Sequence, residues 1–143
     1  MAEALPKVEC GEPLTLLLLD MDHFKSIDDR FGHAVGDAVL RQMGALLAAS
    51  CRASDLAVRY GGEEFVLALT SVDRAAAVEI ADRLRSTVAA HDWPSIAPGL
   101  SAAVSIGVAS ASEAGDAGAL LALTDRRLYA AKHGGRNQVV AVN

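Results

Sequence analysis

The strongest constraint on the fold comes from an uninterrupted apolar run near the start of the chain. Residues 14–19 read L-T-L-L-L-L, and a carboxylate, Asp20, follows directly. The run lacks the alternation of a half-exposed strand, so it is typical of a strand buried on both faces in the middle of a sheet. It is also far too short to span a bilayer. We therefore expect a central strand that ends on an acidic residue.

The remaining pattern alternates between helical and strand-like segments. Asp22 and Asp73 stand where helix N-caps are expected, and Gly32 is the expected stop of the first helix. After the first strand, the predicted elements are helices over 22–31 and 33–51, strands at 56–60 and 65–69, a helix over 73–90, a strand over 100–109, a helix over 116–132 and a strand over 138–142.

This β-α-α-β-β-α-β-α-β order, without repeats or a Pro/Gly-rich linker, predicts one α/β (α+β) domain over residues 1–143. We expect a mixed central sheet flanked by helices. The composition agrees with a globular protein, since 52% of the 143 residues are hydrophobic and 22% are charged.

The charge and the cysteines limit the functional classes. A net charge of −5 argues against a nucleic acid partner bound over the whole surface, although a local anion site stays possible. No signal peptide or membrane-inserting segment is recognisable, and we expect a cytoplasmic location. Cys10 and Cys51 have neither metal-ligand spacing nor the density of a disulfide scaffold, so we interpret them as reduced.

Residues 59–65, R-Y-G-G-E-E-F, form the most unusual stretch of the chain. Gly61 and Gly62 suit a tight hairpin that needs positive φ at its tip. A turn does not explain Glu63 and Glu64, because adjacent carboxylates repel each other and favour neither turn nor strand. Together with Asp20 they are hard oxygen ligands, of the kind that Mg²⁺ bound to a nucleoside triphosphate requires. The alternative is a set of carboxylates that are merely solvated.

The sequence resembles a GGDEF domain, the catalytic module of diguanylate cyclases, in its GGEEF form. The resemblance runs in order along nearly the whole chain and is carried by D-M-D-H-F-K-S-I-D-D-R-F-G-H-A-V-G-D at 20–37, R-A-S-D at 52–55, R-Y-G-G-E-E-F at 59–65, V-S-I-G-V-A at 104–109 and A-K-H-G-G-R-N at 131–137. It implies a fold akin to nucleotidyl cyclases and polymerase palms. It also implies the condensation of two GTP into cyclic di-GMP and two pyrophosphates, by two domains that face each other in a homodimer.

The resemblance assigns the metal site. Asp20, the carbonyl of Met21 and Glu63 match the family's ligands for Mg²⁺ or Mn²⁺, and Glu64 lies next to this edge. Glu63, Glu64 and Lys25 form the expected catalytic set. Asp22 stands outside the metal set, because an N-cap interpretation is at least as good as a ligand interpretation.

The resemblance also implies the contacts to GTP. Phe24 and Lys25 fall at the start of the first helix, where backbone N–H groups and the helix dipole favour a phosphate. Lys132 and Arg136 match further phosphate contacts, although outside the motif each would be an ordinary solvated cation at a helix end.

Guanine recognition is where the chain departs from the family pattern. Asp28 stands where the family carries a base-reading Asn, while Asp37, the second base contact, is retained. An ionised Asp accepts from the guanine edge but cannot donate as an amide does. This departure concerns the affinity for GTP and the selectivity among purines.

A second site is implied by the R-x-x-D motif of Arg52 and Asp55, which resembles the family's inhibitory site for cyclic di-GMP. Arg52 would grip phosphate and a guanine edge, and Asp55 would accept from guanine. Without the motif's position, the two residues would be an exposed ion pair after a helix. Arg83 matches a secondary contact, with a solvated helix face as its alternative.

The family's usual D-x-L-T-G-L-x-N-R-R segment is not found before the first strand. The expectation is a fragment that starts after this segment or a degenerate member, with an N-terminal sensory domain missing. A diguanylate cyclase with product inhibition is the favoured function. The alternatives are a non-catalytic receptor for cyclic di-GMP and a regulatory module that binds GTP without turnover. An intact G-G-E-E-F with Asp20 and Lys25 favours the enzyme, since a receptor needs none of them.

Overall fold

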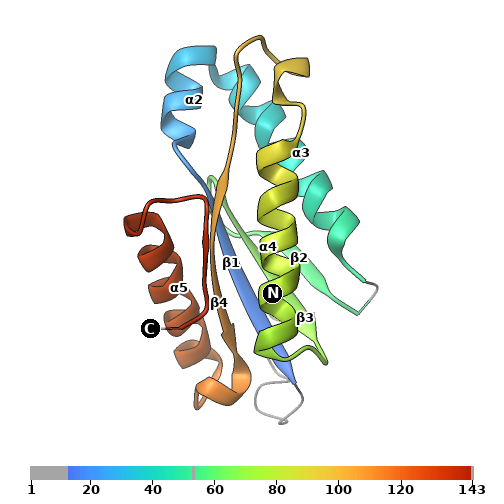
Figure 1. The fold of residues 1–143 in the computed structure, drawn as a ribbon, viewed down its shortest axis with the longest axis vertical. Coiled ribbons are helices and arrows are strands. Elements are labelled where there is room, and N and C mark those ends of the chain that lie inside the picture. The colour runs from blue at the N-terminus through green and yellow to red at the C-terminus, as the bar shows by residue number, and fades with distance from the viewer. Residues whose placement is uncertain (1–12, 53, 143) are drawn as a thin grey trace.

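The computed structural model describes residues 13–52 and 54–142. Figure 1 shows a twisted sheet with helices on both sides. The elements are β1 (Leu14–Met21), α2 (Phe24–Phe31), α3 (His33–Ser50), β2 (Leu56–Arg59), β3 (Glu64–Thr70), α4 (Arg74–Ala90), η1 (Trp93–Ser95), β4 (Val104–Ser110), η2 (Ala111–Glu113), α5 (Ala117–His133) and β5 (Val139–Val140). The predicted order of strands and helices is confirmed, with two short 3₁₀ helices added.

The sheet is mixed, and β1 is its middle strand. The strand order is β2-β3-β1-β4-β5, with β1 antiparallel to both β3 and β4, and β5 parallel to β4. All residues from Leu14 to Leu19 are buried. The absence of alternation in the sequence therefore reflects a strand that is covered on both faces.

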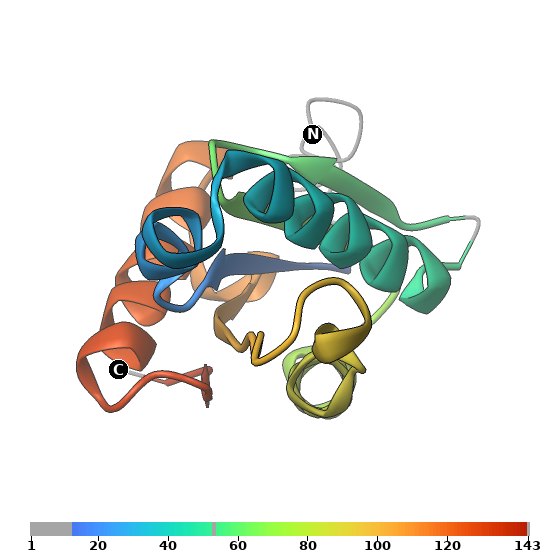
Figure 2. The ribbon, with the colours of Figure 1, turned by 90° about the horizontal axis from the view of Figure 1, so that it is seen from above.

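Each face of the sheet has its own hydrophobic core. The odd-numbered residues of β1, such as Leu17 and Leu19, pack with α2, α3, α4 and Trp93. The even-numbered residues, such as Leu16 and Leu18, pack with α5. Figure 2 shows α5 on one side of the sheet and α3 and α4 on the other. The result is a three-layer arrangement in which side chains of β1 alternate between two cores.

A glycine in β4 allows α5 to lie very close to the sheet. A Cβ on Gly107 would collide with the backbone of Thr124 and Leu128 in α5. The missing side chain in V-S-I-G-V-A therefore sets the distance between α5 and β4. This contact matters for the site, because α5 carries Lys132.

Two strands differ most from their expected bounds. The strand predicted over 100–109 begins only at Val104, and the strand predicted over 138–142 is limited to Val139–Val140. Apolar residues outside the ladder, such as Leu100 and Ala102, are buried by packing and not by strand pairing, which a pattern of hydrophobicity cannot distinguish.

The interpretation of Asp22 as a helix N-cap is wrong. The helix begins at Phe24, its cap is His23 in a left-handed conformation (φ 55°), and no side chain caps it. The carboxylate of Asp22 accepts tertiary hydrogen bonds instead, from β4 and from the turn after α5. By contrast, Asp73 does cap α4, because its Oδ1 accepts from Ala76 N at 2.9 Å.

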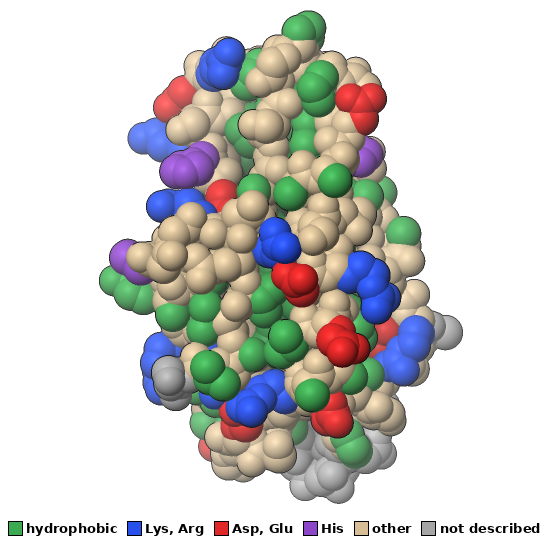
Figure 3. Space-filling view, in the orientation of Figure 1, with side chains coloured by type: hydrophobic (Ala, Val, Ile, Leu, Met, Phe, Trp, Pro, Cys, Tyr) green, Lys and Arg blue, Asp and Glu red, His purple; other side chains and the backbone are tan. Residues whose placement is uncertain are grey.

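The surface shows no concentration of one charge on the face that carries α4. Acidic and basic side chains are interspersed there (Figure 3), which fits the small net charge of −5. Cys51 is a free, partly buried thiol, and burial is the main cause that raises its pKa. Cys10 lies outside the described residues.

Candidate active site

The hairpin between β2 and β3 turns without left-handed glycines. Neither Gly61 nor Gly62 has a positive φ, so the expected role of these glycines in the turn is wrong. The carbonyl of Glu64 accepts from Tyr60 N at 2.8 Å and from Gly61 N at 3.3 Å, which closes the loop. The guanidinium of Arg59 donates to the carbonyls of both glycines. The loop is therefore held by Arg59 and backbone bonds, and glycine serves to leave open space.

That open space lies directly over the tip. A Cβ on Gly62 would meet no atom within 4 Å, and one on Gly61 would touch only the side chain of Glu64. A ligand can therefore approach the backbone of the tip without obstruction.

The strand register brings the acidic residues together. Asp20 of β1 is the direct partner of Glu64 in β3, so their side chains share the face of the sheet that α5 covers. The Met21 amide donates to the carbonyl of Glu63 at 3.3 Å, which holds the hairpin against the end of β1. Two segments more than 40 positions apart in the sequence thus form one carboxylate-rich edge.

The electrostatics of this edge are unfavourable for the carboxylates alone. Burial is the largest cause that raises the pKa of Glu63, and the negative charge of Asp20 raises it further. The pKa of Glu64 is also raised, by burial and then by Asp20 and Asp125. Lys132 opposes both shifts. An edge with excess negative charge attracts a cation.

The donor set fits a divalent cation that is only partly enclosed by protein. Asp20 Oδ1 is buried and accepts no hydrogen bond from the described residues, and its cationic neighbour is Lys132. Within the described ranges, no three His, Cys, Asp or Glu side chains are grouped so as to hold an ion by themselves. Mg²⁺ does not need such a cage, because it keeps waters and binds through one or two carboxylates plus substrate phosphates. Asp20, Glu63 and the Met21 carbonyl match this requirement.

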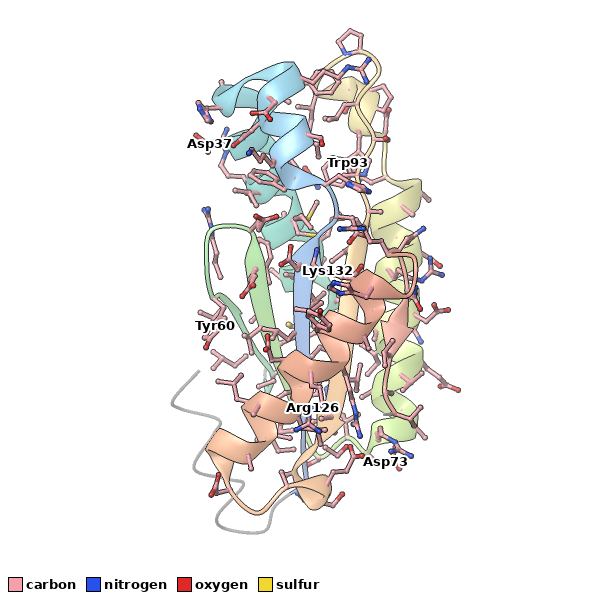
Figure 4. All side chains as sticks on the ribbon, turned by 90° about the vertical axis from the view of Figure 1, so that its left-hand side faces the viewer. Asp37, Tyr60, Asp73, Trp93, Arg126 and Lys132 are labelled. Atoms are coloured by element: carbon pink, nitrogen blue, oxygen red, sulfur yellow. The ribbon has the colours of Figure 1, made fainter. Side chains whose placement is uncertain are left out.

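Lys132 is the cation that the chain itself supplies to this edge. Its Nζ lies 3.2 Å from Asp20 Oδ1 and 3.6 Å from Asp22 Oδ1. Figure 4 shows Lys132 on α5 at the level where β1 ends, and Asp37 on α3 beyond that end of the strand. The predicted phosphate contact is thus beside the predicted metal ligand.

The other predicted phosphate contacts lie in the two segments that follow β1 and α5. Phe24 and Lys25 open α2, one turn beyond the end of β1, and Lys25 is exposed. Arg136 is exposed in the turn after α5 and adopts a left-handed backbone (φ 63°). No hydrogen bond or ion pair is formed by the side chain of Lys25 within 13–52 and 54–142, so its ammonium is available to an anion.

The predicted base contacts lie between α2 and α3. Asp28 Oδ2 lies 3.2 Å from His33 Nδ1, and Asp37 is exposed one turn into α3. A Cβ on Gly36 would collide with the carboxylate of Asp28 and crowd the Phe24 ring. Gly36 therefore permits the close packing of α3 against Asp28 and Phe24 of α2, one residue before Asp37.

The R-x-x-D residues form a pair at the other end of the hairpin. Arg52 donates to both carboxylate oxygens of Asp55, at 3.2 Å and 3.0 Å, and to the Thr70 carbonyl at 2.7 Å. Arg52 side-chain atoms are 53% exposed, whereas those of Asp55 are 2% exposed. Bonds from Arg52 lower the pKa of Asp55 against the opposing effect of burial. The structure does not join Arg83 to this pair through any hydrogen bond or ion pair of the described residues.

Comparison with known proteins identifies the architecture. The family model described as "Diguanylate cyclase, GGDEF domain" matches residues 1–138. The chain belongs to the GGDEF family. Response regulator PleD of Caulobacter vibrioides is 45% identical over 134 residues, which cover 91% of this chain and 29% of that protein. Diguanylate cyclase A of Treponema denticola is 36% identical over 132 residues, covering 92% and 36%.

Solved GGDEF structures share the fold. The active GGEEF domain of a diguanylate cyclase from Vibrio cholerae gives a TM-score of 0.88 at 27% identity, covering 99% of this chain and 96% of that chain. The GGDEF domain of DgcB from Caulobacter crescentus, solved in complex with c-di-GMP, gives 0.86 at 31% identity, covering 98% and 82%. This GGDEF chain thus spans about a third or less of the length of the two curated relatives. None of its described helices has the length and apolar character needed to cross a membrane.

Besides the two glycines, Asp22 was assigned a wrong role from the sequence. The sequence did contain a pattern that indicates the position of Asp22. Asp20 and Asp22 continue the two-residue spacing of Leu14, Leu16 and Leu18, whose side chains pack on the side of α5. Side chains two apart on a strand face the same way. Extending the strand periodicity past Asp20 would have placed Asp22 on the side of α5.

Proposed function

We propose that this GGDEF domain, over residues 1–143, is a diguanylate cyclase that condenses two GTP into cyclic di-GMP and two pyrophosphates. The observation that carries the proposal is the edge at which Asp20, Glu63 and Glu64 converge, where three carboxylates share the single ammonium of Lys132, 3.2 Å from the buried Asp20 Oδ1. A purely structural role does not account for keeping mutually repelling carboxylates at the mouth of a hairpin.

The reaction consists of two equivalent displacements. In each, the 3′-oxygen of one GTP forms a bond to the α-phosphorus of the other, the bond from that phosphorus to pyrophosphate breaks, and the hydroxyl proton is released. Mg²⁺ or Mn²⁺ held by Asp20, Glu63 and the Met21 carbonyl would supply charge neutralisation at the phosphates and lower the pKa of the attacking hydroxyl.

The residues of the chain bind and orient the triphosphate. Lys25 and the first amides of α2 offer positive charge and donors on one side of the edge, and Lys132 and Arg136 do so on the other. Asp28 and Asp37 accept from the N1–H and N2 amino groups of guanine. The open backbone over Gly61 and Gly62 leaves room for the nucleotide next to Glu63.

Each domain offers one such edge, whereas a cyclic product needs two GTP in opposite orientation. We therefore propose that the active species is a homodimer with two domains related by a twofold axis. Activity per molecule should then rise with protein concentration.

We propose further that Arg52 and Asp55 form an inhibitory site for cyclic di-GMP. The exposed side of the Arg52 guanidinium suits a phosphate or the guanine edge. Its pairing with Asp55 holds the guanidinium in one orientation. Arg83 would add a second contact if a neighbouring domain presents it.

The deciding experiment is to incubate the protein with GTP and Mg²⁺ over a wide range of protein concentrations and to identify products by chromatography with mass detection. Cyclic di-GMP whose rate rises more steeply than linearly with protein supports a dimeric cyclase. No product, even from a fusion to a dimerising coiled coil, would refute the enzyme. Binding of cyclic di-GMP without turnover would then support the receptor.

A further inference from the structure

Asp22 is a buried carboxylate with a defined set of partners. Only 3% of its side chain is exposed. Oδ1 accepts from Ser105 Oγ at 2.6 Å, and Oδ2 accepts from the Asn137 amide at 2.8 Å. A buried carboxylate is unfavourable unless it is paired and hydrogen-bonded, so these contacts fix the positions of its partners. They join β4 and the turn after α5 to the end of β1.

The turn after α5 needs this kind of support. Arg136 and Asn137 both adopt positive φ, 63° and 45°, in the left-handed region that side chains with a Cβ rarely adopt. Such residues keep this conformation only where surrounding contacts hold them. The Arg136 amide donates to Ala131 O at 3.1 Å, and the Asn137 amide donates to Asp22. Asp22 thus anchors the turn that presents Arg136.

Asp22 also gives Lys132 a second anionic partner. Lys132 Nζ lies between Asp20 Oδ1 and Asp22 Oδ1. The proposed cation would engage Asp20, whereas both oxygens of Asp22 are already used within the protein. Lys132 therefore retains a negative partner at the edge when Asp20 is engaged, and its position does not depend on the metal ligand alone.

We propose that Asp22 is a positioning residue that holds Lys132 and Arg136 at the substrate edge, and that it acts on GTP binding through them. This inference rests on the proposed function of the site. Because Lys132 and Arg136 contact phosphate throughout the reaction, their displacement should weaken ground-state and transition-state binding alike and raise KM more than it lowers kcat.

Three variants distinguish the contact of Asp22 with Lys132 from its contacts with Ser105 and the Asn137 amide. Asp22→Ala removes both the charge and the acceptor for the turn. Asp22→Asn keeps an acceptor for the Asn137 amide and can donate to Ser105 Oγ, but it offers Lys132 no charge. Ser105→Ala is the matched control, since it deletes a buried bond to Asp22 and leaves both the charge and the turn contact. Each is measured for KM and kcat with GTP and Mg²⁺, and for hydrogen exchange of the Asn137 amide.

We expect Asp22→Ala to raise KM roughly tenfold to a hundredfold, as removal of outer-shell partners does, and to speed exchange of the Asn137 amide. Asp22→Asn should raise KM while leaving that exchange rate near wild type. Ser105→Ala should change KM and the exchange rate of the Asn137 amide by less than about threefold each. This factor corresponds to the lower end of the free-energy range for one hydrogen bond. If Asp22→Ala does not fold, the isosteric Asp22→Asn still tests the contact to Lys132.

Unchanged KM in Asp22→Asn and Asp22→Ala would overturn the proposal. Equal effects of Asp22→Ala and Ser105→Ala would also overturn it, because loss of any buried bond would then suffice. A wild-type protein without cyclase activity would refute the proposed function separately. In that case the KM comparison is replaced by calorimetric binding of Mg²⁺ and GTP, and an unchanged Asn137 exchange rate in Asp22→Ala would still refute the anchor.

Discussion

At the scale of single residues, the hairpin carboxylates oppose the stability of the fold. Burial and neighbouring negative charges raise the pKa of both Glu63 and Glu64, so each ionised group is less stable here than in water. Groups that weaken a fold in this way are concentrated at functional sites. Replacing one should therefore affect stability and activity in opposite directions.

Glu63→Gln keeps the shape of the side chain and removes one of the repelling charges. We expect turnover of GTP to fall roughly a hundredfold to a thousandfold, comparable to the loss of a key electrostatic group, while the Tm of the metal-free protein stays equal or rises. Steady-state assays and thermal unfolding measure the two effects. Glu79→Gln, at an exposed position of α4, is the control. Undiminished turnover in Glu63→Gln would refute its role as a metal ligand.

Asp28→Asn tests the departure from the family pattern. An amide both donates and accepts, so it can satisfy more of the guanine edge than an ionised carboxylate. We expect KM for GTP to fall by roughly three- to tenfold, the value of about one hydrogen bond, with little change in kcat. Asp29→Asn, at the neighbouring exposed position of α2, should leave KM unchanged. A rise in KM for Asp28→Asn would show that the carboxylate suits this site better.

The residues that the sequence could predict were those with a distinctive chemical pattern. Asp20, Glu63 and Glu64 were expected to meet, and the register places Asp20 opposite Glu64. The glycine conformations and the role of Asp22 could not be predicted locally. Arg59 replaces the expected left-handed turn by binding loop carbonyls, and the partners of Asp22 are more than 80 positions away.

At the scale of elements, an ion-pair network fastens α5 to the sheet. Glu113 in η2 accepts from both terminal nitrogens of Arg127, each at 2.9 Å, and from the Ser110 amide at 2.9 Å. Arg127 is buried and also donates to the Val108 carbonyl at 2.9 Å. Arg74 of α4 adds an ion pair to Glu113 at 2.9 Å. Three elements and the end of β4 thus meet at one carboxylate.

This network predicts a pH dependence of stability. Hydrogen bonds from Arg127 lower the pKa of Glu113 from 4.5 to about 2. Because the folded-state pKa is below the unfolded value, the stabilisation is complete above pH 4.5 and is lost as the pH falls toward 2. We expect Glu113→Gln to lower the free energy of unfolding at neutral pH by roughly 1–3 kcal/mol.

Denaturant unfolding of the wild type and Glu113→Gln across acid pH checks this. The difference between the two proteins should shrink as the pH falls through the stated window. A difference that does not change with pH would mean that the contribution of Glu113 comes from packing and not from its charge.

The sequence could predict which elements exist better than where they end. Burial on both faces makes β1 recognisable, and Asp73 caps α4 as expected. The ends of β4 and β5 depend on which backbone groups find a ladder partner, which hydrophobicity does not encode. Arg127 was not foreseen because an Arg on a helix usually faces water, and only the fold brings Glu113 to it.

At the scale of the whole molecule, the proposed catalytic and inhibitory sites are joined by one strand. Glu64 begins β3 at the carboxylate edge, and Thr70 ends it where its carbonyl accepts from Arg52. The side chains of β3 that point away from α5, such as Leu67, pack in the core with α3 and α4. A ligand at Arg52 would thus bind a residue that is hydrogen-bonded to the strand that also positions the catalytic edge.

Removing the guanidinium group of Arg52 should weaken the binding of product without lowering the turnover of GTP. We expect Arg52→Ala to weaken cyclic di-GMP binding by roughly tenfold or more, as loss of a charged hydrogen-bonding partner does, while initial turnover at low product is retained. Calorimetry and product-inhibition curves measure this.

Two further variants guard the interpretation of that test. Arg52→Lys keeps a charge near the buried Asp55 and should fold even if Arg52→Ala does not, yet it lacks the bidentate fork. Arg41→Ala, at an exposed position of α3, is the control. Unaltered product affinity in both Arg52 variants would rule out the inhibitory-site assignment.

The pairing of β1 with β3 also determines where the chain can change its length. Because Asp20 faces Glu64 through a fixed register, one residue inserted between Arg59 and Glu64 can be absorbed by the loop, whereas one inserted within β3 turns every later side chain to the other face. The segment between α4 and β4 is not paired with any strand, so an insertion there does not shift the register of the sheet. Natural variation in length should therefore collect there, while the spacing from Glu64 to Thr70 stays constant.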